Sequence, residues 1–309
     1  MALNTAKYIS VQRDLTQKFR EGAMAATPFY PTLCTEIQSG GADEKYGMLG
    51  SMPGVREWLG DRIFKKLRAG DFTITNREWE NSVEFEKNDI DDDRIGLMTN
   101  LAQDFGQEAM LHPDELLVEA LVAGETTACF DGQYFFDTDH AWGDSGTQSN
   151  DLTYAAAALA TPTAAEFRAA FHAARVKMLG YVNDQGKKLN RPIIRGANKF
   201  LVLVPLELQN AAEEGLNAAL TTNGGTNVVI DKPEIVPCPS LTDASKFYTF
   251  LQEGTLKPFV FQKRRPIRTP VWKGMDDPET KTLKMMTDAR YNLGYLAWWK
   301  AVVTDFTQA

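Results

Sequence analysis

Hydrophobic residues recur at helical spacing in several segments of the chain. The first is residues 8–25, where Ile9, Leu15 and Phe19 fall at near-helical intervals and Pro28 limits the helix. A later segment begins at Thr161-Pro162-Thr163, a typical helix start, and residues 206–220 also show a helical pattern. The apolar positions of the segment after Thr163 are Phe167, Phe171, Val176 and Met178.

The longest helical pattern follows an acidic run at residues 88–93. Aspartates just before an apolar periodic run favour a helix N-terminus, because they cap backbone amides and complement the helix dipole. We expect this helix to reach Leu111, with Pro113 starting a second helix that ends at Gly124. Its apolar face is expected to consist of Leu97, Leu101, Phe105 and Ala109.

Alternating apolar and polar residues predict strands on both sides of a short polar segment at residues 76–78. Phe72 and Ile74 alternate with threonines before it, and Val83 and Phe85 alternate with Ser and Glu after it. The pattern predicts a β-hairpin within residues 58–87. An isolated hairpin is marginal in water, so we expect it to pack on a neighbouring surface.

Residues 27–54 are predicted to form an arm that runs over a surface, because they are rich in Pro and Gly but still contain scattered apolar side chains.

Residues 284–306 form a continuous, aromatic, strand-like stretch with Gly294 inside it. Helices and strands are mixed without βαβ regularity, which predicts an α+β fold. Other strands are expected at residues 200–204, 227–230, 247–251 and 258–262.

The composition and charge of the chain exclude several classes of protein. The 309 residues are 43% hydrophobic and 24% charged, which excludes wholesale disorder. The sequence shows no apolar run of about 18 residues and no secretory signal, so no membrane association is predicted. Three widely spaced cysteines favour a reducing compartment. The net charge of −8 argues against a dedicated nucleic-acid binder.

Few residues of the sequence suggest a catalytic or metal-binding site. Asp137 and Asp139 precede His140, and carboxylates beside a histidine are a possible divalent-metal site. The alternative is a turn in which the aspartates hold backbone amides, with the aromatic residues around them anchored on the body of the protein. The run at residues 89–93 lacks the ligand spacing and central Gly of a calcium loop.

No nucleotide-binding, metalloprotease or nucleophile-elbow motif is present in the sequence. The compact basic patch of Lys263, Arg264, Arg265 and Arg268 is more typical of pairing with acids on a neighbour than of phosphate binding. We therefore predict no catalytic residue, no cofactor and no resident metal.

Several blocks of sequence, in order, resemble the Mu-like phage major head subunit family. The resemblance is strong over residues 8–143 and weaker towards the C-terminus. The blocks are Tyr46-Gly47-Met48-Leu49-Gly50, Arg56-Glu57-Trp58-Leu59-Gly60-Asp61-Arg62, Phe72-Thr73-Ile74-Thr75-Asn76, Asp89-Ile90-Asp91-Asp92-Asp93, His112-Pro113-Asp114-Glu115-Leu116 and Phe130-Asp131-Gly132-Gln133-Tyr134-Phe135-Phe136-Asp137-Thr138-Asp139-His140.

The resemblance implies a Hong Kong 97-type capsid fold. In that fold an N-terminal arm, an extended hairpin loop and a spine helix surround a peripheral and an axial domain. The spine helix is expected to start near Asp91. Mapped on this chain, the parts are an arm at 1–54, an extended loop at 55–88, a peripheral domain at 89–159, an axial domain at 160–255 and peripheral C-terminal strands at 256–309.

The function that the resemblance implies is a major capsid protein of a tailed phage or prophage. Such a protein assembles in the host bacterial cytoplasm into hexamers and pentamers of an icosahedral shell, and it contacts the packaged DNA only non-specifically. A separate scaffold protein, a portal and a decoration protein are the further partners expected. The alternatives are a metal-dependent enzyme using Asp137, Asp139 and His140, or a tail or connector protein.

Within the expected hairpin, the apolar side chains offer more surface than two strands can hide. We therefore predict that they contact an adjacent subunit. These side chains are Trp58, Phe72, Ile74, Val83 and Phe85.

Overall fold

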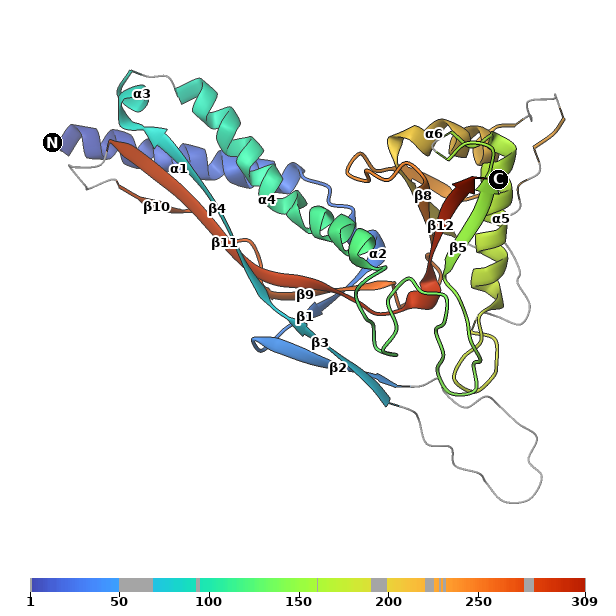
Figure 1. The fold of residues 1–309 in the computed structure, drawn as a ribbon. Helices are drawn as coiled ribbons and strands as arrows, with labels where there is room; N and C mark the ends of the chain where they lie inside the picture. The colour runs from blue at the N-terminus through green and yellow to red at the C-terminus, as the bar shows by residue number, and fades with distance from the viewer. Residues whose placement is uncertain are drawn as a thin grey trace.

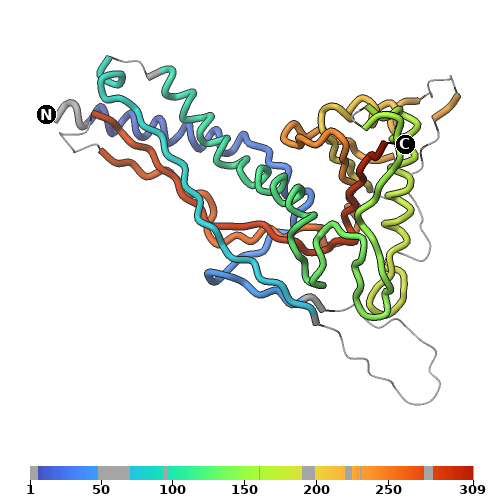
Figure 2. The backbone as a smooth tube through the Cα atoms, in the orientation of Figure 1, coloured from blue at the N-terminus to red at the C-terminus, as the bar shows by residue number. Residues whose placement is uncertain are grey.

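The computed structural model describes residues 2–49, 69–92, 95–159, 161–189, 199–219, 225–227, 229, 232–274 and 281–308. The chain forms an elongated lobe of long helices above a long strand ribbon, and a second lobe built around another sheet (Figure 1). The N-terminus lies at the far tip of the elongated lobe, and the C-terminus lies in the second lobe (Figure 2).

Two long helices, α1 (Ala2–Ala25) and α4 (Ile95–Ala123), pack against each other along the elongated lobe. Leu15 and Phe19 of α1 are buried in a cluster with Met98 and Ala102 of α4. The expected N-terminal helix is confirmed and begins earlier than residue 8. Two short helices flank this pair: α2 (Tyr30–Leu33) and α3 (Lys87–Asp91).

The sheet of the elongated lobe is organised around one long strand, β11 (Thr282–Tyr295). The first half of β11 pairs with β4 (Arg77–Glu86) and β10 (Val271–Lys273). Its second half pairs with β9 (Phe259–Arg265), which in turn pairs in parallel with β1 (Cys34–Gln38). Buried residues alternate along β11, as expected for a strand with one face on the core.

The second lobe contains a five-stranded sheet in the order β5-β12-β8-β6-β7. Helix α5 (Ala164–Gly180) starts with a capping box between Thr163 and Glu166, and it buries Phe167 and Phe171 on the core. The expected helix start at Thr163 is confirmed. The remaining elements are β5 (Asp151–Ala156), β6 (Phe200–Val204), α6 (Leu206–Ala212), a π-helical turn η1 (Glu213–Asn217), β7 (Glu234–Pro237), β8 (Lys246–Leu251) and β12 (Ala301–Gln308).

The predicted hairpin is wrong in its pairing. β3 (Ala69–Thr75) does pair antiparallel, but with β2 (Asp43–Leu49) of the expected arm, whereas β4 pairs with β11. Alternation identifies a strand but not its partner, and β11 is more than 190 residues away in the sequence. The extended two-stranded element therefore begins within the expected arm, and residues 50–68 between its strands lie outside the described residues.

The predicted helix break at Pro113 is also wrong, because α4 continues through this proline. Leu116, Leu117 and Leu121 on the following turns are buried, which compensates for the hydrogen bond that Pro113 cannot make. The predicted apolar face is only partly correct. Leu97 and Leu101 are 70% and 48% exposed, and Met98 and Ala102 face the core instead.

The C-terminal stretch is not one strand. A 3₁₀ turn, η2 (Trp298–Lys300), separates β11 from β12, and β12 joins the second sheet between β5 and β8. The C-terminal strands thus do not all belong to the lobe assigned to them from the sequence. The expected strand at 227–230 includes residues outside the described ones, and β7 lies just after it. The predicted α+β class is confirmed.

Candidate functional site

The segment between α4 and β5, residues 124–150, forms an irregular loop where the two lobes meet (Figure 1). Two isolated bridges shape it, Ala128 with Tyr134 and His140 with Gln148. Gly132 takes a positive φ of 87°, which allows the chain to turn directly after Asp131. This loop contains the candidate residues that the sequence singled out.

Aromatic side chains anchor the loop on the body of the protein. Phe130, Phe135 and Phe136 are buried, whereas Tyr134 is 48% exposed. Phe135 stacks on Tyr295 with ring centroids 4.7 Å apart. The expected anchoring is therefore confirmed for the three phenylalanines, and the apolar area that each buries stabilises the loop.

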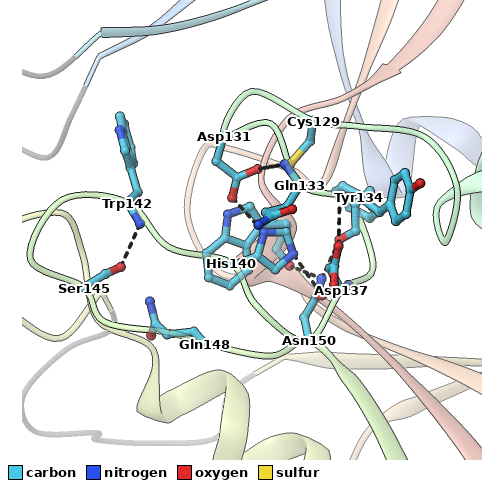
Figure 3. Close-up of polar contacts among 12 residues, drawn as sticks. Cys129, Asp131, Gln133, Tyr134, Asp137, His140, Trp142, Ser145, Gln148 and Asn150 are labelled. Atoms are coloured by element: carbon cyan, nitrogen blue, oxygen red, sulfur yellow. Dashed lines mark hydrogen bonds and ion pairs between the residues drawn. The ribbon is translucent and has the colours of Figure 1, made fainter.

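His140 lies at the centre of the loop and is fully buried (Figure 3). Its ring stacks on Trp298 with centroids 4.1 Å apart and an interplanar angle of 6°. Its Nδ1 is 2.7 Å from Oδ2 of Asp131, and its Nε2 is 3.1 Å from Oδ1 of Asn150. Both ring nitrogens are thus engaged inside the protein.

Asn150 fixes the orientation of the ring. Its Nδ2 donates to the backbone carbonyl of Phe135 at 2.7 Å and to those of Trp298 and Ala301 at 3.3 Å. Its Oδ1 accepts from the backbone N–H of Asp137 at 2.9 Å. Because the amide nitrogen is held by carbonyls, its oxygen faces His140 Nε2, and the two acceptors, Asn150 Oδ1 and Asp131 Oδ2, are both satisfied only when each ring nitrogen carries a proton.

Asp131 is the acceptor on the other side of the ring. Its Oδ1 also accepts from the Cys129 thiol at 2.8 Å and from the backbone N–H of Gln133 at 3.3 Å. Burial opposes ionisation, but the hydrogen bonds from His140 and Cys129 outweigh it and hold the pKa of Asp131 below its usual value. Burial, together with this carboxylate, raises the pKa of the Cys129 thiol, so the thiol is a hydrogen-bond donor and not a thiolate.

Cys129, Asp131 and His140 bring their ligand atoms within 4.8 Å of one another, a spacing compatible with a metal ion. Metal binding by cysteine needs the thiolate. Here the thiol donates to Asp131, and His140 Nδ1 faces the same carboxylate. In the structure, hydrogen bonds within the cluster satisfy its polar atoms. Together with Asn150, the cluster connects the loop to β12 and to η2.

The two aspartates proposed for a metal-dependent enzyme lie beside each other, but the His140 ring nitrogens face Asp131 and Asn150 instead of them. Asp139 is exposed, and its pKa is raised by desolvation and by the neighbouring carboxyl of Asp137. Asp137 accepts from the backbone N–H groups of Tyr134 at 3.2 Å and Thr138 at 2.7 Å. Amide capping is therefore confirmed for Asp137, whereas His140 is paired with Asp131.

Sequence reasoning missed Cys129, Asp131 and Asn150 as members of this network. Only the Asp131-Gly132 dipeptide gave a local signal, because an Asp-Gly pair marks a turn. Asn150 lies ten residues from His140 and contacts carbonyls about 150 residues away, which no local pattern reveals.

Acid should unfold the protein partly through Asp131. Its pKa is lower in the folded chain than the unfolded value of about 3.9, so its stabilising contribution is full above that pH and is lost as the pH falls towards the folded pKa. We expect Asp131→Asn to lower the free energy of unfolding at pH 7 and to lower it much less at about pH 3. Urea unfolding at both pH values measures this. An equal loss at both would contradict the linkage.

The predicted interface side chains are mostly buried within their own chain. Ile74 and Phe85 are 5% and 3% exposed, and Val83 and Phe72 are half-buried against the core clusters. Little of Ile74 and Phe85 is left to contact a neighbour, so the predicted contact would depend mainly on the more exposed Phe72 and Val83. Trp58 lies outside the described residues.

The basic patch also finds its partners inside the chain. Arg265 forms an ion pair with Asp288, and Lys263 lies 3.9 Å from Glu36. Arg264 donates to the backbone carbonyl of Ser39 at 3.2 Å. The expectation of acidic partners is correct in kind for Lys263 and Arg265, but these partners belong to the same subunit. Among the described helices, none is long and apolar enough to span a membrane.

The first half of the chain is similar in sequence to known proteins. A family model described as "Mu-like prophage major head subunit gpT" matches residues 9–161. The Mu-like prophage FluMu major head subunit of Haemophilus influenzae is 42% identical over 127 residues, which are 41% of this chain and 41% of that protein. The major capsid protein of Escherichia phage Mu is 31% identical over 140 residues, 45% of this chain and 46% of that protein. The matched segments span less than half the length of either relative.

The structure itself resembles solved phage capsid proteins. A chain of the procapsid of bacteriophage JBD30 superposes with a TM-score of 0.55 and 22% identity, over 98% of this chain and 76% of that one. At this identity the likeness concerns the fold. The Hong Kong 97-type capsid fold expected from the resemblance is therefore confirmed.

Proposed function

Because residues 9–161 belong to the family of Mu-like prophage major head subunits, we propose that the whole chain is the major capsid protein of a tailed phage or prophage. Copies of the chain would form the hexamers and pentamers of an icosahedral shell around double-stranded DNA. The observation that carries the proposal is the family match over residues 9–161, supported by a capsid fold that extends over 98% of the chain.

The candidate site supports a structural role. Each polar atom of Asp131, His140 and Asn150 that faces the core has a partner, and the network joins the loop to β12. Catalysis needs a group with an open reacting face, whereas His140 is fully buried. We assign the network to stability, and propose no catalytic residue and no cofactor.

The same proposal includes the location of the protein and its partners. The protein would be located in the virion and would assemble in the cytoplasm of the host bacterium. Its partners would be other copies of itself, a separate scaffold protein, a portal and a decoration protein. Trp58 and the half-buried Phe72 and Val83 remain candidates for contact with an adjacent subunit.

Expression of the full chain, alone and with a scaffold protein from the same phage genome, tests the proposal. We expect rings or closed particles in negative-stain micrographs of the purified protein. A compact monomer under all conditions, carrying stoichiometric metal that is lost in a His140→Ala variant, would overturn the proposal and support an enzyme.

Weak interaction with DNA is a further expectation. The chain has a net charge of −8, so the wall of the shell and the phosphates repel each other overall, and the genome stays mobile. We expect the isolated subunit to show negligible binding to duplex DNA at physiological salt in a mobility-shift assay. Tight binding that weakens steeply with salt would contradict this expectation.

A further inference from the structure

A cavity of about 140 Å³ lies between the middle of α4 and the ribbon of β4 and β11. Its wall includes the rings of Trp79, His112 and Tyr291. The centroids of Trp79 and His112 are 4.4 Å apart, and His112 Nδ1 is 2.8 Å from the Tyr291 hydroxyl. Four carboxylates complete the lining: Glu80, Glu108, Glu115 and Asp288.

Only some of the carboxylates that line this pocket have a partner within the described part of the chain. Asp288 pairs with Arg265, and Glu80 accepts from Ser82 at 2.9 Å. Glu108 and Glu115 are exposed and form no ion pair with any residue that the structure describes. No Lys or Arg lines the pocket.

Aromatic faces and carboxylates together attract a cation. Trp79 already carries one, because the guanidinium of Arg77 lies 4.4 Å from its ring centroid. Burial lowers the pKa of His112, so its ring adds no positive charge at neutral pH. The chemistry of the pocket therefore suits the ammonium or guanidinium end of a side chain.

Two segments of the sequence, one in each lobe, differ strongly in charge. α4 contains five acidic residues and no Lys or Arg, whereas residues 161–199 contain eight basic and two acidic residues. Lys177 on α5 and Lys187 in the following turn are exposed and form no ion pair within the described part of the chain. Figure 1 shows α5 on the outer side of the second sheet, away from the α4 of the same chain.

We propose that the acidic pocket on α4 of one copy receives the basic face of α5 from a second copy, with Lys177 and Lys187 opposite Glu108 and Glu115. The inference rests on the proposed function, in which copies surround one another. Two different surfaces meet in this contact, so it is head-to-tail, and repetition with rotation closes a ring. Opposite charges fix the register of such a contact and speed the encounter of the subunits.

Paired charge reversals in the full chain test the contact. Glu108→Lys with Glu115→Lys reverses the pocket, and Lys177→Glu with Lys187→Glu reverses the basic face. Each double variant is expected to lower the assembled fraction in sedimentation by about tenfold or more at low salt. Mixing the two double variants should restore six-membered rings, because every contact in a ring that alternates the two variants is again between opposite charges; a five-membered ring cannot alternate, so rescue is scored on the rings and not on closed shells. The chain with all four changes should also assemble.

Matched single reversals away from both faces, Glu207→Lys and Lys273→Glu, are the controls and should assemble as the unchanged chain does. Circular dichroism verifies that every variant is folded. If the unchanged chain forms particles and the double variants do so equally well, or if mixing folded variants fails to rescue them, the inference is wrong while the capsid function stands. If the unchanged chain never self-associates, both are wrong.

Duplex DNA is the competing occupant of the basic face. If the unchanged chain binds DNA and the Lys177→Glu, Lys187→Glu variant loses that binding but still assembles, the basic face contacts DNA and the inference is overturned. We expect the opposite result, in which the variant loses assembly and DNA binding is negligible for both proteins.

Discussion

Replacing Asn150 with alanine is expected to lower the free energy of unfolding by about 3–5 kcal/mol. The side chain is fully buried and bonds three backbone carbonyls, one backbone N–H and the His140 ring. A buried polar group left without its partner costs about 1–3 kcal/mol, and alanine would leave several such groups behind. Urea unfolding followed by tryptophan fluorescence measures the change, since Trp298 belongs to the site.

Asp139→Asn is the matched control for Asn150→Ala. Asp139 belongs to the same loop but is exposed, so its replacement should change the free energy of unfolding by less than about 0.5 kcal/mol. Equal losses for both variants would show that the buried network is not what holds the loop. A loss near zero for Asn150→Ala would remove the structural role assigned to it.

Gly106→Ala is expected to destabilise the elongated lobe by about 3 kcal/mol or more, although alanine is the better helix former. A Cβ atom at Gly106 would lie 2.0 Å from the backbone carbonyl oxygen of Phe19, and one at Gly22 would lie 1.9 Å from that of Gln103. These contacts are with backbone, so α1 and α4 must separate to relieve them. The separation would disrupt the cluster around Leu15.

The control for this effect is Gly96→Ala in the same helix. A Cβ at Gly96 meets nothing within 4 Å, so the substitution should stabilise the protein by about 0.5–1 kcal/mol through helix propensity alone. Thermal unfolding of the two variants should therefore move in opposite directions. A Gly106→Ala variant as stable as Gly96→Ala would show that the two helices do not approach each other closely at this point.

Two kinds of information determine this fold, local sequence patterns and contacts between distant residues. Local patterns located the strands at residues 200–204 and 247–251 almost to the residue, and they placed the capped start of α5 at Thr163. Each of these depends on neighbours within a few residues: an apolar run, or a Thr and a Glu three positions apart. Ordered blocks of sequence also indicated the family whose model matches residues 9–161, because several matches in sequence order are specific where one alone is not.

The tertiary structure alone decided which elements meet. β3 and β4 both alternate correctly, yet β3 pairs with β2 and β4 with β11, since alternation fixes the faces of a strand and not its partner. Asp131, His140 and Asn150 became one network because the loop folds back on itself, and Asn150 also contacts carbonyls in the last strand region. The sequence by itself therefore determined most of the elements and the resemblance to a family whose model matches residues 9–161. Strand partners, the close approach of α1 and α4 and the buried polar network depend on contacts between distant residues, which only the folded chain brings together.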